Sequence, residues 1–125
     1  MKTNSKKYVD GFVIPIKKKD LAAYKKMATW GANTWMKYGA LSYFECVGDD
    51  LAVQKGMGMG FKKLTGLKPT ETVIFSFIVY KSKADRDRIN KKVMSDPGMK
   101  EFEGKTMPID MNRFVCGGFD TLVEG

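Results

Sequence analysis

The residues of this sequence that could do chemistry are polar side chains set singly into apolar, strand-like segments. Their types suit a small-molecule pocket, because arginine pairs with an anionic group, carboxylates accept hydrogen bonds or a proton, and tyrosine rings form walls. Six residues make up this candidate pocket: Asp10, Tyr43, Glu45, Ser76, Tyr80 and Arg113. The alternative is a purely structural network, in which the buried arginine and the carboxylates satisfy one another.

Residue types that are absent exclude several kinds of chemistry. The chain has no histidine, which removes Ser-His-Asp and Cys-His nucleophilic catalysis and histidine-ligated zinc. Cys46 and Cys116 are far apart, and neighbouring Asp49 and Asp50 lack the ligand spacing of a calcium loop. We therefore expect no metal site and no cofactor. Whether the protein is an enzyme stays open, and a catalyst would have to use carboxylates, tyrosines, lysines or arginines.

Length and composition predict a single domain over residues 1–125. Hydrophobic residues make up 43% of the chain, which is enough apolar material for a core. No apolar run approaches the roughly 18–20 residues of a membrane span. Asp10, Gly11 and Pro15 interrupt the segment that would follow the basic start of a signal peptide. We expect a cytoplasmic protein whose two cysteines are reduced, small core residues.

The hydrophobic spacing predicts four strands and two main helices. A helix over 21–38 follows from apolar residues at three- and four-residue spacing, and Ser82 caps a second helix that ends at Met94. The predicted strands are 8–16, 41–47, 71–80 and a last one near 111–119, with a helical turn at 61–64 inside the long connection 49–70. The order βαββαβ is the ferredoxin-like α+β arrangement, a four-stranded antiparallel sheet with both helices on one face. Its first and third strands are expected in the centre.

Alternation along the strands divides the sheet into two faces. We expect the helices to cover one set: Val9, Gly11, Val13, Phe44, Cys46, Val73, Phe75, Phe77, Val79, Phe114, Cys116 and Gly118. The opposite face would then carry the candidate pocket, yet it is too apolar to face water. This predicts a homodimer through that sheet face, with the pocket between the face and the 49–70 loop.

An RNA-binding module is the alternative from a different class of function. Topology and the net charge of +8 agree with it, and Phe75 and Phe77 echo the aromatic half of an RNA-recognition strand. Against it, the predicted phase buries both rings, and 22 basic residues include only three arginines. We expect neither nucleic acid nor a membrane as a partner. The glycines between Gly56 and Gly60 lack the spacing of a dinucleotide loop and suit a connector or lid.

Several segments together resemble a YbaA-like family of uncharacterised bacterial proteins over nearly the whole chain. They are YVDGF at 8–12, ECVGDD at 45–50, ETVIF at 71–75, VMSDP at 93–97, MPID at 107–110, Arg113 and GGF at 117–119. The resemblance implies the dimeric α+β barrel, in which two ferredoxin-like sheets pack face to face. It implies no established activity, substrate or cofactor.

The function that the sequence favours is a homodimer that binds a small, partly apolar molecule. A structural or interaction dimer and the RNA-binding module remain the alternatives. Cofactor-free monooxygenases and small-molecule isomerases share this architecture, which is an analogy of fold alone.

Overall fold

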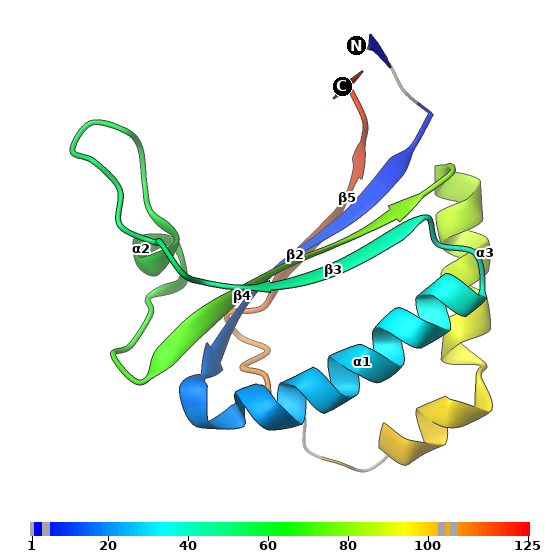
Figure 1. Ribbon diagram of the computed structural model, residues 1–125, viewed down its shortest axis with the longest axis horizontal. Coiled ribbons are helices and arrows are strands. Elements are labelled where there is room, and N and C mark those ends of the chain that lie inside the picture. Colours follow the sequence, from blue (N-terminus) through cyan, green and yellow to red (C-terminus); the bar gives the residue numbers. More distant parts are fainter. Residues whose placement is uncertain (1, 4–5, 103–104, 106–107) are drawn as a thin grey trace.

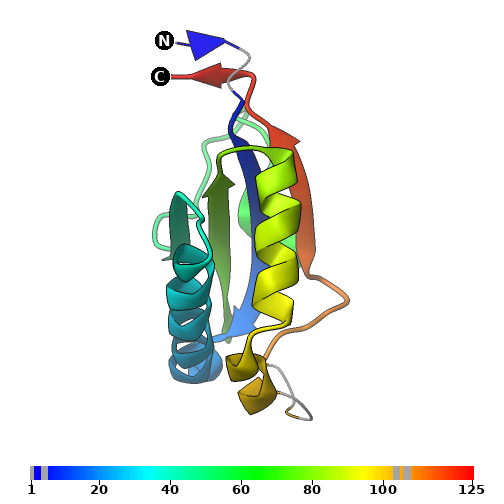
Figure 2. The same ribbon diagram turned by 90° about the vertical axis from the view of Figure 1, so that its right-hand side faces the viewer.

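The computed structural model describes residues 2–3, 6–102, 105 and 108–125, and it contains one four-stranded antiparallel sheet with two long helices on one side (Figures 1 and 2). The sheet has the order β3-β4-β2-β5, so the first and third of the predicted strands are central, as expected. Its strands are β2 (Tyr8–Lys17), β3 (Ser42–Val47), β4 (Glu71–Tyr80) and β5 (Val115–Asp120). The long helices are α1 (Leu21–Lys37) and α3 (Lys83–Met94), and α2 (Phe61–Thr65) is a short helix.

The smaller elements frame this core. Short 3-10 helices cover Lys18–Asp20 and Pro97–Phe102, and the end strands β1 (Lys2–Thr3) and β6 (Val123–Glu124) pair beside each other (Figure 1). The ferredoxin-like α+β prediction is confirmed by this topology.

The helix ends follow the signals in the sequence. The Ser82 hydroxyl accepts a hydrogen bond from the Asp85 amide at 3.1 Å, which is the predicted N-terminal cap of α3. Gly39, two residues beyond α1, has a φ of +115°, where a side chain would be strained. These local signals fix where the helices begin and end. Both helices lie across the same side of the sheet and form the layer seen in Figure 2.

For strands β2, β3 and β4, the prediction of which sheet face the helices cover is wrong. The core under α1 and α3 contains Ile14, Ile78 and Tyr80, which alternate onto the same face as Asp10, Glu45 and Ser76. Polar residues are tolerated there because the helices bring side chains that hydrogen-bond them. The face away from α1 and α3, here called the open face, is the apolar one.

The placement of Cys116 and Gly118 on the helix face is as predicted, but the phase of the last strand relative to the other three strands is corrected. Because Phe12 pairs with Cys116 and Val13 with Val115, Cys116 and Gly118 lie on the helix face and Val115 on the open face. The strand begins at Val115, so Arg113 precedes it and is not a strand residue. The open face therefore consists of Val9, Gly11, Val13, Pro15, Ser42, Phe44, Cys46, Val73, Phe75, Phe77, Val79, Val115, Gly117 and Phe119, with the charged register partners Lys17 and Glu71 at one end.

The connection 49–70 leaves the sheet as an arm on the side opposite α1 (Figure 1). It contains the predicted helical turn as α2, and the ring of Phe61 meets that of Phe75 edge-on at 6.0 Å. The arm covers one end of the open face, where Pro15 and Val73 are buried, and leaves Phe44 and Phe119 more than half exposed. Much of the open face thus stays uncovered in the single chain.

Both cysteines are exposed and free, so the expectation that they are core residues is wrong. Cys46 lies on edge strand β3 and Cys116 on the opposite edge strand β5, which keeps them apart within one chain. Within the described ranges, none of the helices has the length and apolarity to cross a membrane.

Candidate functional site

A cavity of about 480 Å³ lies between the helix face of the sheet and the helices. We call it the central cavity. Five of the six predicted pocket residues line it: Asp10, Tyr43, Glu45, Ser76 and Tyr80. The remaining walls are mostly apolar: Phe12, Ile14, Met27, Trp35, Ile78, Met94, Ile109, Met111 and Phe114. The residues therefore gather as predicted, but on the opposite side of the sheet from the 49–70 arm.

Glu45 on β3 forms the first polar centre of this cavity. Its Oε2 accepts a hydrogen bond from the Tyr24 hydroxyl of α1 at 2.7 Å, and its Oε1 accepts one from the Tyr43 hydroxyl at 2.9 Å. Burial, and next the neighbouring Glu45, raises the pKa of both tyrosines well above its usual range. Both hydroxyls therefore stay protonated and act as hydrogen-bond donors.

Gly31 on α1 makes room for this arrangement. A Cβ atom at this position would lie 2.8 Å from the Tyr43 hydroxyl oxygen, closer than real contacts allow. Glycine here lets the tyrosine side chain pass against the helix backbone and reach Glu45. A glycine in the middle of a helix is unfavourable by about 1 kcal/mol relative to alanine, so its presence indicates that the position of Tyr43 matters.

Two further cavities of about 450 Å³ each adjoin this centre. The outer cavity lies along α1 and the edge strand β3, and includes Lys25 and Val47. The side cavity lies toward Trp30, Met99 and Phe102. Both share Tyr24, Tyr43 and Glu45 with the central cavity, so the carboxylate stands where the three meet.

Asp10 on β2 forms the second polar centre. Its Oδ1 accepts a hydrogen bond from the Arg86 guanidinium of α3 at 2.8 Å, while the Tyr80 hydroxyl lies 3.1 Å from its Oδ2. The same hydroxyl is 3.2 Å from Asn90 Oδ1, which also accepts the Trp35 indole N–H at 3.0 Å. The polar groups of this centre are paired and mostly hydrogen-bonded to one another. This is what the alternative of a purely structural network predicts for a buried carboxylate.

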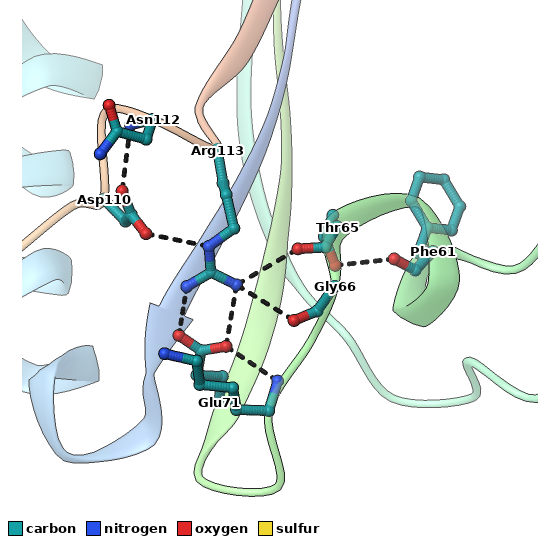
Figure 3. A network of polar contacts seen from close by, with 8 residues as sticks. Phe61, Thr65, Gly66, Glu71, Asp110, Asn112 and Arg113 are labelled. Atoms are coloured by element: carbon teal, nitrogen blue, oxygen red, sulfur yellow. Dashed lines mark hydrogen bonds and ion pairs between the residues drawn. The ribbon is translucent and has the colours of Figure 1, made fainter.

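Arg113 lies outside the central cavity and joins three segments elsewhere (Figure 3). Its guanidinium binds both carboxylate oxygens of Glu71, at 3.0 and 2.5 Å, and Asp110 Oδ2 at 2.9 Å. It also donates to the carbonyl oxygens of Thr65 and Gly66 at the end of α2. Hydrogen bonds from Arg113, and next from the Lys68 amide, lower the pKa of Glu71 to about 2. Arg113 is thus a structural clamp, and the anion-pairing role expected of it has no place at the cavity.

The sequence reasoning missed the residues that the helices contribute to the cavity. Tyr24 and Trp35 belong to the apolar stripe of α1, so their spacing predicts that they are buried but does not indicate a polar role. Arg86 and Asn90 stand four residues apart on α3, which places them on one side of that helix. That spacing was the available signal for a polar helix face turned toward the sheet.

Chemically, the central cavity offers hydrogen-bond acceptors and neutral donors inside apolar walls. Glu45 can accept a further hydrogen bond or a proton, and Ser76 adds a hydroxyl. Among the residues that the structure describes, no three cysteine or carboxylate side chains cluster in a way that could hold a metal ion.

Comparison with solved structures supports the fold. A proposed antibiotic biosynthesis monooxygenase from Nitrosomonas europaea matches with a TM-score of 0.52 at 11% identity, covering 98% of this chain and 96% of that one. A NIPSNAP family protein of unknown function from Agrobacterium tumefaciens matches with a TM-score of 0.54 at 14% identity, covering 94% and 90%. At these identities the likeness concerns the fold alone.

Sequence comparison finds much nearer relatives. The chain is 44% identical over 120 residues to the uncharacterised protein YbaA of Escherichia coli K12, covering 94% of this chain and 98% of that protein. YbaA of Shigella flexneri matches with the same identity and coverage. The model of a family described as "Protein of unknown function (DUF1428)" matches residues 7–111. The resemblance found in the sequence is thereby confirmed, and the chain belongs to the DUF1428 family.

Proposed function

We propose that this protein is a homodimer that binds one small, mostly apolar molecule in the central cavity of each subunit. The observation that carries the proposal is the carboxylate of Glu45, held by two tyrosine hydroxyls where three mostly apolar cavities meet. A structural core would fill such a space with side chains at close-packed density. Ligand sites instead combine apolar walls with a few convergent polar groups, in volumes of roughly 300–1,000 Å³.

The dimer part of the proposal rests on the open face. The charged residues in its strands are confined to one end, where Lys17 on β2 is the register partner of Glu71 on β4. The rest of the face is apolar and includes Phe44, Phe75, Val115 and Phe119, which are each about half exposed. An antiparallel sheet that faces water normally alternates apolar and polar residues, and contiguous exposed apolar patches mark interaction sites. A second copy of the same face is the simplest cover, because a two-fold axis makes one apolar patch complementary to itself.

RNA is the rival occupant of the open face, and one observation favours it. Phe75 and Phe77 lie on this face and not beneath the helices, as stacking platforms for bases would require. RNA binding also needs lysines or arginines beside the aromatic rings to contact phosphates. The strands of the open face offer only Lys17, which lies at the end of β2 opposite Glu71 and away from Phe77, so a second copy fits the face better.

Sedimentation velocity of a charge substitution on the open face tests the dimer. We expect the wild-type chain to sediment with the mass of two chains and Phe44→Glu as a monomer, since a charge would be buried unpaired at the interface. Met36→Glu is the matched control, because Met36 is a similarly exposed apolar residue on α1. A monomeric wild type would overturn the dimer, and RNA binding that weakens steeply with salt would then take its place.

Cys116 is a built-in reporter for occupancy of the central cavity, because it is exposed and lines that cavity. In a Cys46→Ser background it is the single thiol of the chain. We expect 2-phenylethanol or 2-phenylethylammonium to slow its alkylation by iodoacetamide, measured by intact mass. A Lys91→Cys thiol in a background with both native cysteines replaced by serine is the matched control, since residue 91 is exposed on α3, lines none of the three cavities and should react at an unchanged rate. Equal rates at Cys116 with and without both probes would refute the cavity as a ligand site.

A further inference from the structure

The charges that line the three cavities do not cancel. Asp10 is paired with Arg86 at 2.8 Å, so that pair contributes little net charge to the central cavity. Among the described residues, no lysine or arginine lies within ion-pair distance of Glu45. Lys25 shares the outer cavity with it and is exposed to solvent. The central and side cavities therefore carry the uncompensated negative charge of Glu45.

The carboxylate also has free acceptor capacity. An ionised carboxylate has about four lone-pair positions on its two oxygens. Tyr24 occupies one position on Oε2 and Tyr43 one on Oε1. The two hydroxyls fix the orientation of the carboxylate and leave one position on each oxygen for donors from a ligand. A half-buried carboxylate with free acceptor positions and no cation beside it is best satisfied by a donor that carries positive charge.

Aromatic rings surround the same carboxylate. Tyr24, Tyr43 and Trp35 line the central and side cavities together with Glu45, and the rings of Trp35 and Tyr43 lie 6.0 Å apart at an interplanar angle of 41°. The hydrogen bond from the Trp35 indole to Asn90 holds that ring in place. Aromatic faces beside a carboxylate attract organic cations through the negative charge density of the rings.

We propose that the ligand of this site is a small organic amine with an apolar body, bound as its ammonium ion against Glu45 among the rings of Tyr24, Tyr43 and Trp35. This inference rests on the proposed cavity function and specifies its ligand class. A cationic ligand takes the place of the anionic ligand expected from Arg113, since Arg113 is bound to Glu71 and Asp110 away from the cavity.

The net charge of the chain acts against a cation only at long range. The charge of +8 is carried largely by exposed lysines, whose repulsion is screened by salt over about 10 Å at 0.1 M ionic strength. The contact with Glu45 inside the cavity is screened much less. We therefore expect the affinity for the ammonium ligand to stay constant or rise with added salt. Attraction of the ligand by an oppositely charged protein surface would instead weaken with salt.

Calorimetric titration with three probes that share a phenylethyl body tests the inference. The probes are 2-phenylethylammonium, the neutral 2-phenylethanol and the anionic 3-phenylpropanoate. We expect the ammonium to bind wild type at least about tenfold more tightly than the alcohol, and the anion to bind most weakly. Glu45→Gln should remove the preference for the ammonium while changing the affinity for the alcohol by no more than about twofold. Glu101→Gln, an exposed site with the same change in charge, should leave the preference intact.

The outcomes separate this inference from the proposed function. Equal binding of the ammonium and the alcohol, or preference for the anion, would overturn the ligand class while leaving the cavity as a small-molecule site. Binding of none of the probes, with Cys116 unprotected, would remove the cavity function itself. The comparison of probes on wild type needs no variant, so it stays decisive if Glu45→Gln unfolds.

Discussion

Replacing Gly31 with alanine tests whether the approach of Tyr43 to Glu45 holds the site together. Alanine is about 1 kcal/mol better than glycine inside a helix, so a methyl group with room would stabilise α1. At this position the new Cβ would lie 2.8 Å from the Tyr43 hydroxyl oxygen, and the ring must withdraw. Withdrawal breaks the 2.9 Å hydrogen bond to Glu45. A hydrogen bond to a charged group contributes about 1.5–3 kcal/mol, so we expect a net loss of about 0.5–2 kcal/mol.

The same substitution should change sign when the hydroxyl is absent. In a Tyr43→Phe background, the nearest atoms to the new methyl are a ring carbon at 3.5 Å and a Trp35 carbon at 3.6 Å, which are ordinary contacts. Gly31→Ala should then stabilise by about 1 kcal/mol. Urea unfolding of the four proteins, followed by circular dichroism at one protein concentration, measures both effects. Stabilisation of similar size in both backgrounds would refute the close approach and its hydrogen bond.

Three further predictions concern the framework around the cavity. Because the pKa of Glu71 is lowered to about 2, the contribution of Glu71 to stability is full above its unfolded pKa of about 4.3 and is lost as the pH falls toward 2. Glu71→Gln should therefore reduce the dependence of the unfolding free energy on pH in this range. An unchanged pH dependence would contradict the Arg113 clamp. Gly118→Ala should destabilise by about 1–3 kcal/mol in urea unfolding, since its Cβ would overlap the hydroxyl of buried Tyr8. Tyr8→Phe should not rescue it, because ring carbons at 2.8 and 2.9 Å also obstruct the methyl group. Arg86→Met should destabilise by about 2–4 kcal/mol by leaving the buried Asp10 carboxylate without its cation, and a loss below about 0.5 kcal/mol would show that the pair contributes little.

The elements and their order could be predicted because their signals are local. The capping serine at 82, the left-handed Gly39 and the apolar spacing along α1 each act within a few residues. The run 71–80 was predicted with the bounds that β4 has. Short crossovers of known handedness then leave few ways to order four strands.

The assignment of the sheet faces could not be predicted with the same rules. Grouping Asp10, Glu45 and Ser76 on one face was correct, since all three line the central cavity. Placing that face away from the helices was wrong, because the polar groups are satisfied by Tyr24 and Arg86 from α1 and α3. Strand alternation shows which residues share a face and does not show which layer packs on it.

Arg113 and Arg86 show how far the choice of site residues depended on tertiary structure. Both are arginines near acidic residues in sequence, and only the four-residue spacing of Arg86 and Asn90 favours Arg86 as the one that reaches the cavity. The late start of β5 at Val115 leaves Arg113 in the preceding loop, where it binds Glu71. Arg86 instead faces Asp10 across the layer between α3 and the sheet.

Native mass spectrometry of the purified protein, with 2-phenylethylammonium added and then under denaturing conditions, reads the dimer and the occupied cavity together. We expect the mass of two chains carrying up to two bound amines, which are lost when the protein is denatured. Glu45→Gln should give the same two-chain mass without the retained amine. A single-chain mass at micromolar concentration would contradict the proposed dimer, and a two-chain mass that takes up no amine would contradict the proposed ammonium ligand.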